Sequence, residues 1–380
     1  MIKTIIISDF QAAPMLGGGQ IATHDLVKCL SKYYKIKYIG YPFKGVEKNP
    51  NVEIIYPLRD FSKKLPNLWG LQLKSRILRR LFWNFPDLLI KSLNISEDLL
   101  ISNNELDFIL MNPKMKIEFN KVIIRKQSSL KNFSAPGYPE RLIKNRNFRI
   151  IAINKTDYKT LSKLYGKAKT KLIPCGIKLN LFNKNEIKGT ILRLKKQLNI
   201  ENKKIIFSIG RLEDDQKGFS FGINAMRLLK TNNYIYLIAG EGSSKKRYQH
   251  LIRKYNLKNK VKLIGSCSEI EKSALFSMAS VVLQPSLHES FGLVMIEALR
   301  EGAILLVTKN AGALDVIKDQ KNGFFINTCP DDIASKLDLV LNMRKNKLNK
   351  LSHAAKITAK NYSIERMQDS FHRLIESMFK

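Results

Sequence analysis

The chain has 380 residues, enough for two domains of ordinary size, and its 44% hydrophobic and 26% charged residues are typical of a folded protein. No apolar run approaches the roughly 18 residues of a membrane-spanning helix, and the apolar start of the chain turns polar too early for a signal peptide. The 4 cysteines lie far apart without a CxxC pair. We therefore expect a cytoplasmic protein with reduced thiols and no zinc site.

The formal net charge of +34 is the unusual property of this composition. It has two explanations: lysines spread over solvated faces, or an anionic partner such as lipid, nucleic acid or a nucleotide. Basic residues concentrate between 59 and 91, interleaved with aromatic residues that include both tryptophans. This pattern favours binding to an anionic membrane surface, whereas the four-residue spacing of Leu73, Ile77 and Leu81 allows an ordinary helix that packs inward. The regular aromatic pattern of a single-strand binding module is absent, so we expect no specific nucleic-acid partner.

Short apolar runs alternate with helical spacing along the first half of the chain. A helix is expected at about 19–32, where one apolar stripe recurs at helical intervals. Strands that alternate with helices predict a parallel, doubly wound sheet, which binds ligands at the carboxyl ends of its strands. The expected strands are 5–7, 36–39, 52–55, 99–101, 108–111, 122–124 and 150–153.

The same alternation begins again in the second half, after a polar passage at 178–204. We therefore expect two doubly wound, Rossmann-like domains, 1–177 and 178–363, that face a central cleft, with a last helix at about 364–380 that crosses back to the first domain. The expected strands are 205–209, 235–239, 261–264, 281–283, 304–307 and 324–326, and the expected helices lie near 219–230, 245–255, 270–278 and 293–299.

The stretch from Gln284 to Gly302 carries the most information about chemistry. An apolar strand ends at Pro285, a loop follows, and a helix begins after Gly292 and can stop at Gly302 in a left-handed cap. Such a loop directs the free N–H groups of the first helical turn, and the positive end of the helix dipole, toward a crevice. The pattern predicts an anion pocket, with phosphate as the favoured ligand.

Two carboxylates, Glu289 and Glu297, bracket this expected pocket. If the whole interval were helical, they would lie about 12 Å apart along the axis and roughly 80° apart around it. The two carboxylates of a glycosidase lie only about 5 Å apart in retaining enzymes and up to about 9.5 Å apart in inverting ones. The spacing therefore favours contacts with the two ends of one elongated ligand that carries an anion between them.

Glycine-containing turns follow three of the expected strands. The triplet Gly17-Gly18-Gly19 has the placement of a phosphate loop but lacks the dinucleotide and Walker spacings, so a plain tight turn is the alternative. The turn 210–218 carries Arg211 and Lys217, which could bind a diphosphate or simply pair with the acidic residues between them. Gly240 ends another strand and permits close approach of a ligand to the backbone.

Two histidines are candidates for acid–base chemistry. His24 lies off the apolar stripe of the first helix, so it either faces the cleft or is a surface residue. His288 lies in the loop before the helix that begins after Gly292, where it could serve only as a loop donor. No Ser-His-Asp order and no cluster of metal ligands is evident.

A series of motifs runs in order through the second half of the chain. They are Gly210-Arg211-Leu212 with Lys217-Gly218, Ala239-Gly240-Glu241-Gly242, Leu263-Ile264-Gly265, the stretch Pro285–Ala298 with its two glutamates eight apart, and Gly312 with Asn322-Gly323. Together these motifs resemble the retaining glycosyltransferases of family four, which have the GT-B fold. The first half resembles this family more loosely, through its glycine triplet and through 173–177, where Cys175 stands at a usual asparagine.

The resemblance implies transfer of a sugar from a nucleotide-sugar donor with retention of anomeric configuration. It implies that Arg211 and Lys217 hold the donor diphosphate, that Glu297 binds the ribose hydroxyls and that Glu289 contacts the donor sugar. The remaining implied contacts are the backbone of Phe291, Gly292 and Leu293 at the distal phosphate and sugar, and Gly18 at the phosphates. No metal or other cofactor is implied, because the cationic residues and the helix terminus can neutralise the diphosphate.

One departure from the family concerns a histidine that many members place in the first domain, after a strand such as 122–124. Here the region 125–133 contains no histidine. Either Gln127, Ser128 or His24 takes over its contact, or the acceptor step differs. The main hypothesis is a cytoplasmic, peripherally membrane-associated transferase with a glycan or lipid-linked acceptor in cell-surface glycan assembly. The alternative is a non-catalytic subunit that partners an active transferase.

Overall fold

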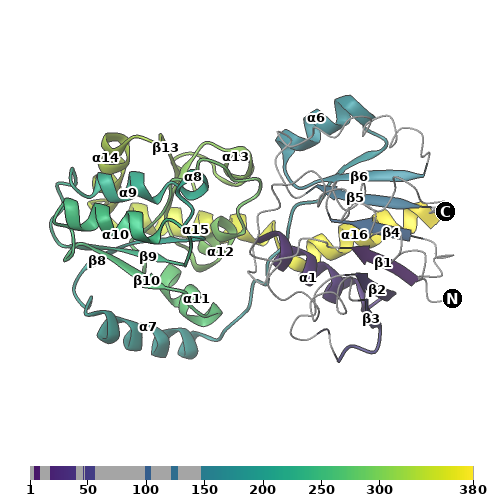
Figure 1. Ribbon diagram of the computed structural model, residues 1–380, viewed down its shortest axis with the longest axis horizontal. Coiled ribbons are helices and arrows are strands. Elements are labelled where there is room, and N and C mark those ends of the chain that lie inside the picture. Colours follow the sequence, from purple (N-terminus) through teal and green to yellow (C-terminus); the bar gives the residue numbers. More distant parts are fainter. Residues whose placement is uncertain are drawn as a thin grey trace, which may run out of the picture. The chain divides into compact units, whose positions relative to one another are not determined.

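The computed structural model describes residues 4–8, 18–39, 46, 48–55, 99–103, 121–126 and 147–379. The chain divides into two compact units. Unit 1 comprises Met1–Pro174 and Met367–Lys380, and unit 2 comprises Cys175–Arg366. Each unit is built around one parallel sheet (Figure 1). The prediction of two doubly wound parallel sheets is therefore confirmed.

Unit 1 contains a seven-stranded sheet in the order β3-β2-β1-β4-β5-β6-β7, and all pairings between neighbours are parallel. Its strands carry near-continuous apolar runs, such as Ile5 to Ile7 with at most 1% exposure, because both faces of a parallel sheet are covered. The strands are β1 (Thr4–Ser8), β2 (Lys35–Ile39), β3 (Val52–Ile55), β4 (Leu99–Ser102), β5 (Val122–Lys126), β6 (Phe148–Ala152) and β7 (Thr170–Leu172). The strand expected at 108–111 lies outside the described residues.

The described helices of unit 1 are α1 (Gly18–Leu30), α6 (Lys155–Tyr165) and the greater part of α16 (Ile364–Phe379). Asn154 begins α6 by accepting a hydrogen bond from the backbone of Asp157. Arg125 of β5 is fully buried and links the two other helices: it donates to the carbonyl oxygen of Ala22 in α1, and it lies 5.6 Å from the ring of Phe371 in α16.

Unit 2 contains a six-stranded parallel sheet in the order β10-β9-β8-β11-β12-β13. In the central register, Ile206 of β8 lies opposite Tyr236 of β9 and Val281 of β11. The direction of the connections reverses between β8 and β11, which places the switch point, where such sheets bind ligands, at the carboxyl ends of these two strands. The strands are β8 (Lys204–Ile209), β9 (Tyr234–Ala239), β10 (Val261–Gly265), β11 (Val281–Gln284), β12 (Leu305–Thr308) and β13 (Phe324–Ile326).

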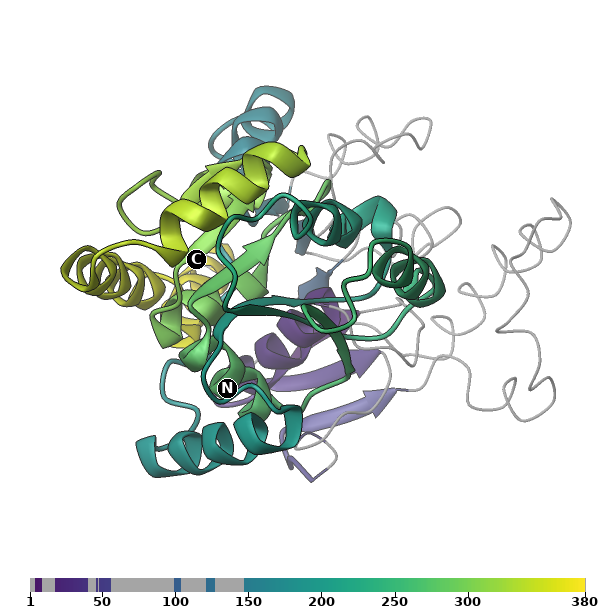
Figure 2. The ribbon, with the colours of Figure 1, turned by 90° about the vertical axis from the view of Figure 1, so that its left-hand side faces the viewer.

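Helices cover both faces of this sheet (Figures 1 and 2). In one group, α9 (Phe219–Ala225) packs against both α10 (Lys245–Lys254) and α14 (Pro330–Leu341). The other group is α7 (Lys184–Leu198), α11 (Glu269–Met278), α12 (Leu293–Glu301) and α15 (Lys345–Lys360). Two short helices, α8 (Asp214–Lys217) and α13 (Ala311–Val316), complete the unit. Among the described helices, none combines the length and the apolar composition needed to cross a membrane.

The polar passage expected at 178–204 contains a regular helix, α7, that the sequence analysis did not predict. Asn183 caps its first turn, and the side chain of Glu186 bonds back to the backbone of Asn183, which completes a capping box. Helix α7 packs against α11, and its side chains Thr190 and Leu194 are buried. Its polar composition reflects a largely solvated helix and not an extended connection.

Candidate functional site

Glycine turns lie at the carboxyl ends of three neighbouring strands in unit 2, β8, β9 and β10. The amide of Gly210 donates to the carbonyl oxygen of Ala239 at 3.1 Å, and the amide of Gly240 donates to that of Gly265 at 2.7 Å. Gly240 has a φ of 131°, and a Cβ atom on it would collide with the carbonyl oxygen of Gly210. Contact between two backbone segments thus accounts for this glycine, while its contact with a donor stays a prediction.

The buried carboxylate of Asp214 holds the turn 210–218 in place through hydrogen bonds to two neighbouring helices. Asp214, only 8% exposed, accepts hydrogen bonds from the amide and hydroxyl of Ser220 and from the hydroxyl of Tyr248. Its second oxygen also lies 3.2 Å from the guanidinium of Arg247. Asp214 therefore joins α8, α9 and α10 beneath the turn, and the two cationic residues of the turn stand on a rigid base.

The structure separates the roles of these two cationic residues. Arg211 is about half exposed and makes long contacts within the turn, 3.4 Å to Glu213 and 3.3 Å to Gln216. Arg211 therefore pairs with neighbours on a solvated turn, which is the alternative that the sequence left open. Lys217 instead reaches out of the turn: its Nζ lies 2.8 Å from Oε2 of Glu289. Two predicted site residues, 72 positions apart, are thus in direct contact.

The predicted succession of strand, loop, helix and glycine is confirmed at β11 and α12. Gly292 precedes the helix with a left-handed φ of 78°, and Gly302 ends it with a φ of 81°. Because its N-cap residue is a glycine, α12 begins without a side-chain capping hydrogen bond. The amide of Met295 donates to the carbonyl oxygen of Gly292, which leaves the amides of Leu293 and Val294 available for an anionic ligand.

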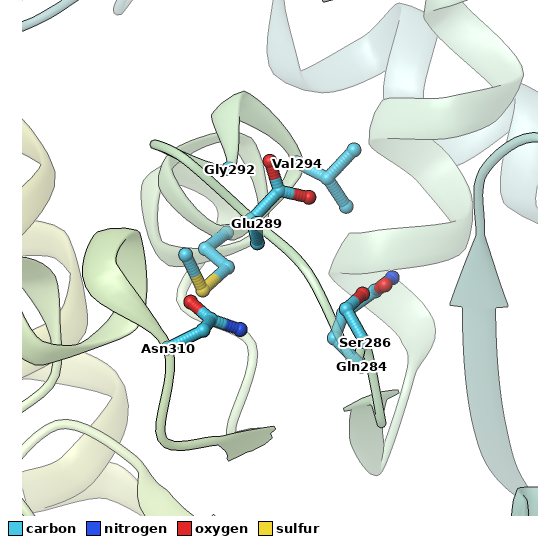
Figure 3. Close-up of a pocket in the computed structure, with 7 residues that line it drawn as sticks. Gln284, Ser286, Glu289, Gly292, Val294 and Asn310 are labelled. Atoms are coloured by element: carbon cyan, nitrogen blue, oxygen red, sulfur yellow. The ribbon is translucent and has the colours of Figure 1, made fainter. Parts of the chain in front are cut away.

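The loop before α12 lines a small open pocket together with the end of β11 and the start of α13 (Figure 3). Figure 3 shows Glu289 beside Val294 at the start of α12, and Gln284 and Ser286 together at the end of β11. Asn310 also lines the pocket; it caps α13 by accepting from the amide of Ala313 at 3.0 Å. The sequence analysis missed Asn310, although an asparagine between a strand and a short helix is a recognisable N-cap signal.

Neighbouring segments hold this loop in place. The amide of Leu287 donates to the carbonyl oxygen of Gln216, and the amide of Gly312 donates to that of Glu289. A Cβ atom on Gly312 would collide with the backbone of Phe291. Phe291 is itself only 4% exposed. The backbone contact with a ligand that the resemblance implies for this residue stays a prediction.

Glu297 lies further along α12 and is held by a lysine that the sequence analysis did not consider. Nζ of Lys272, on α11, lies 2.8 Å from Oε1 of Glu297, and the two side chains are only 10% and 13% exposed. Burial raises the pKa of Glu297, and the charge of Lys272 opposes this rise. Both residues are presented by helices that pack against each other.

The remaining candidates lie in unit 1 or on the surface. His24, on α1, lies edge-on to the ring of Tyr38 with 6.5 Å between ring centroids. Burial and then the nearby charge of Lys28 lower the pKa of His24 to about 4, so its imidazole is neutral at physiological pH. Gly18 is the first residue of α1, whereas Gln127 and Ser128 lie outside the described residues. The roles expected of these four residues stay predictions.

His288 is exposed, and its amide donates to the carbonyl oxygen of Gln216 at 3.3 Å. Across the parts of the chain that the structure describes, no group of three or more His, Cys, Asp or Glu side chains could hold a metal ion. The expectation that no metal takes part stays an expectation.

Comparison with known families gives this geometry a context. Residues 191–358 match the family described as "Glycosyl transferases group 1". This segment is a group 1 glycosyltransferase domain. It contains both loops of the site and all three of Lys217, Glu289 and Glu297.

Curated relatives match the chain over part of their length. An uncharacterized glycosyltransferase of Methanocaldococcus jannaschii is 28% identical over 51% of this chain and 50% of its own length. The GalNAc-alpha-(1->4)-GalNAc-alpha-(1->3)-diNAcBac-PP-undecaprenol alpha-1,4-N-acetyl-D-galactosaminyltransferase of Campylobacter jejuni is 30% identical over 47% of this chain and 49% of its own length. The chain thus spans about half the length of these relatives.

Solved structures match this chain over nearly its full length. HepE from Anabaena, solved in complex with UDP and glucose, has a TM-score of 0.74 and 17% identity over 99% of this chain and 100% of that chain. Sucrose-phosphate synthase from Thermosynechococcus elongatus has a TM-score of 0.78 and 17% identity over 99% of both chains. Such likeness concerns the fold alone, and it confirms the expected GT-B class.

Proposed function

We propose that the protein is a retaining glycosyltransferase that moves a sugar from a nucleoside-diphosphate sugar to a glycan or lipid-linked acceptor. The observation that carries this proposal is the 2.8 Å contact between Lys217 and Glu289 beside the uncapped start of α12, within a group 1 glycosyltransferase domain. A cation, a carboxylate and free helix amides in one place suit a ligand that has both phosphate oxygens and sugar hydroxyls.

The proposed chemistry relies on stabilising the leaving group. As the bond between the sugar carbon and the diphosphate oxygen breaks, negative charge grows on the diphosphate. Lys217, Arg211 and the amides at the start of α12 would stabilise this charge more strongly than the charge of the bound donor, which lowers the barrier. All of these groups belong to the protein itself, so the proposal includes no metal ion.

The contact between Lys217 and Glu289 also has a part in donor binding. In the ligand-free site each of these charges neutralises the other at 2.8 Å, and both side chains are about one-fifth exposed. A diphosphate would draw Lys217 away from the carboxylate. Glu289 would then be available to accept hydrogen bonds from the hydroxyls of the donor sugar.

For the acceptor, we propose a lipid-linked or cell-surface glycan at the inner face of a membrane. The support is the basic, aromatic segment 59–91, which lies outside the described residues. Names of similar proteins also support it: the Campylobacter jejuni relative carries an undecaprenol-linked substrate in its name, and WaaG, with a TM-score of 0.69, is described as involved in lipopolysaccharide biosynthesis.

A donor screen tests the proposed function. The melting temperature of the purified chain is measured with UDP-, GDP- and ADP-sugars, and release of the free sugar is then followed by mass spectrometry. A donor at 100 times its dissociation constant should stabilise the folded state by about 2.7 kcal/mol. The absence of a shift with every donor would contradict the proposal. Binding without hydrolysis or transfer would instead favour the non-catalytic subunit.

A further inference from the structure

Lys272 is a buried cation in unit 2 that neither the sequence motifs nor the proposed chemistry uses. It lies on the inner side of α11, among the buried residues Ser273, Ala274 and Leu275, and its side chain is 10% exposed. Lysine is almost never buried to this extent unless a partner compensates its charge. The contacts of Lys272 must therefore explain why a lysine stands at this position.

Two carboxylates contact this lysine, and they differ in their surroundings. Oε1 of Glu297 lies 2.8 Å from Nζ, and Oε1 of Glu269 lies 2.9 Å from it. Glu269 is 61% exposed, whereas Glu297 is 13% exposed. Glu297 accepts the lysine bond through Oε1, and its Oε2 receives no hydrogen bond from the described residues. One oxygen of Glu297 is therefore held by Lys272, while the other has no hydrogen-bond partner among the described residues.

The charges of the group reinforce this geometry. Burial lowers the pKa of Lys272, but attraction to Glu297 and Glu269 outweighs burial, so that this pKa lies above its ordinary value. Lys272 is therefore charged at neutral pH. Its charge also opposes the burial that would otherwise favour the protonated form of Glu297.

Stability alone gives a weak reason for this arrangement. Desolvation of two buried charges costs nearly as much as their attraction returns, and apolar residues of similar volume often replace such pairs without loss of stability. The residues that follow Lys272 on α11, Ser273, Ala274 and Leu275, are buried and small or apolar, so an apolar side chain would suit the inner side of this helix. A role that requires the Glu297 carboxylate itself explains the pair better.

We propose that Lys272 is a positioning residue for the nucleotide end of the donor: its contact with Glu297 fixes Oε1, so that Oε2 is directed at the ribose hydroxyls. This inference rests on the proposed function, because it takes a ribonucleotide as the ligand of Glu297. A fixed carboxylate oxygen can accept from the 2′- and 3′-hydroxyls together. Lys272 therefore sets the preference of the site for ribonucleotides over 2′-deoxyribonucleotides.

Binding measurements on the full chain test this inference. Calorimetry compares UDP, ADP and GDP with their 2′-deoxy counterparts and with pyrophosphate, which has no ribose. For the wild type we expect at least one diphosphate to bind more tightly than its 2′-deoxy counterpart. In Lys272→Met, affinity for that diphosphate should fall on the order of 10- to 100-fold, as for loss of a hydrogen bond to a charged group. The preference over the 2′-deoxy form should disappear, and affinity for pyrophosphate should stay unchanged.

Further variants separate positioning from a merely structural role. Because Lys272 acts through Glu297, the double variant Lys272→Met/Glu297→Gln should bind no more weakly than Glu297→Gln alone. Glu269→Gln is the matched control, since it removes the exposed partner of the same lysine, and it should bind like the wild type. Lys272→Gln takes the place of Lys272→Met if the latter does not fold, as judged by its melting temperature.

Two results would overturn the inference. One is a Lys272 variant that keeps the wild-type preference for the ribonucleotide. The other is a variant that weakens ribonucleotide and pyrophosphate binding equally, as a general change in charge or structure would do. If the wild type binds none of the diphosphates, the proposed function itself fails. If it binds them with the expected preference and the variants do likewise, only the role of Lys272 is wrong.

Discussion

At the scale of single residues, the site depends on two lysine–glutamate contacts. Lys217 meets Glu289 at the start of α12, and Lys272 meets Glu297 deeper along the same helix, each at 2.8 Å. The first pair is about one-fifth exposed and the second is nearly buried. We therefore expect the first pair to exchange partners when a donor binds, and the second to stay intact as part of the framework.

The two cationic residues that we propose to bind the donor diphosphate should matter for turnover. Replacing Lys217 or Arg211 by Ala should lower the rate of sugar transfer on the order of 100-fold, comparable to the loss of one preorganised donor. The rate is measured at a saturating concentration of the donor identified by the screen. Lys245→Ala is the control, because this lysine forms an exposed pair with Glu241, four residues earlier in the chain. Wild-type transfer by Lys217→Ala would refute the role of Lys217.

His24 should make stability depend on pH. Burial, followed by Lys28, holds the pKa of His24 at about 4, below its ordinary value of 6.5. The unfolded chain therefore takes up a proton between pH 6.5 and 4 that the folded chain does not, and the free energy of unfolding falls as the pH drops through this range. Melting temperatures between pH 7 and 4.5 should show a shallower decline for His24→Gln than for the wild type.

The control for this measurement is His353→Gln, at an exposed position on α15. Its melting temperature should follow the wild-type curve. Equal slopes for the His24 variant and the wild type would show that this imidazole does not resist protonation in the folded state.

At the scale of elements, α12 follows β11, the strand at the switch point of the sheet, and it carries Glu297 and the first-turn amides of the candidate site. Glycines in the left-handed conformation bound it at both ends, and these boundaries could be predicted because caps are local signals. Helix α7 was not predicted, although its local signals are present. Asn183 and Glu186 form a capping box and apolar residues recur at helical spacing from Ile187 to Leu198, but the many lysines and asparagines around them favoured a polar connection.

The glycine before α12 should be intolerant of a side chain. Gly292 has a φ of 78°, and a Cβ atom on it would lie 3.0 Å from Cγ of Glu289 and would collide with Met295. Gly292→Ala should therefore displace the carboxylate and the first amides of the helix, and it should weaken donor binding with the sheet intact. Calorimetry of donor binding, with circular dichroism as the test of folding, measures this effect.

The matched control for Gly292→Ala is Gly189→Ala in α7. No atom lies within 4 Å of a Cβ atom on Gly189, and this glycine is in a helix interior. The substitution should stabilise the protein by roughly 0.5–1 kcal/mol and leave donor binding unchanged. Equal donor affinity in both alanine variants would contradict the importance of the Gly292 backbone.

At the scale of the whole molecule, the charge of +34 raises the question of a membrane surface. We expect the wild type to sediment with vesicles that contain anionic lipid at low salt and to be released at high salt, because each basic residue near such a surface contributes about 1 kcal/mol that salt screens. Failure to sediment at low salt would refute membrane association.

A pair of charge variants tests where this association lies. Replacing Lys74, Arg76, Arg79 and Arg80 by Gln should abolish sedimentation if the segment 59–91 carries it. Replacing four exposed lysines of α15 by Gln removes the same charge elsewhere and should leave most of the binding; these are Lys345, Lys347, Lys350 and Lys360. Equal losses in the two variants would indicate a generic effect of net charge.

The sequence by itself determined what depends on local order along the chain. Apolar periodicity predicted strands and helices such as β8 and α12, their alternation predicted two doubly wound sheets, and the ordered glycines and glutamates predicted a phosphate-binding loop. Each of these signals lies within about 20 residues, where the spacing of side chains follows directly from the period of a helix or a strand.

Only the tertiary structure decided which charges meet. Lys217 and Glu289 are 72 positions apart, and Lys272 and Glu297 are 25 apart, on separate elements in each case. Their contacts depend on the strand order and on how α11 packs against α12, and no local pattern encodes these distances. For the same reason, the sequence did not predict that Asp214 would hold the 210–218 turn through Ser220 and Tyr248. The residue types thus predicted the candidate site residues Lys217, Glu289 and Glu297, whereas the packing of the elements determined which lysine contacts which glutamate.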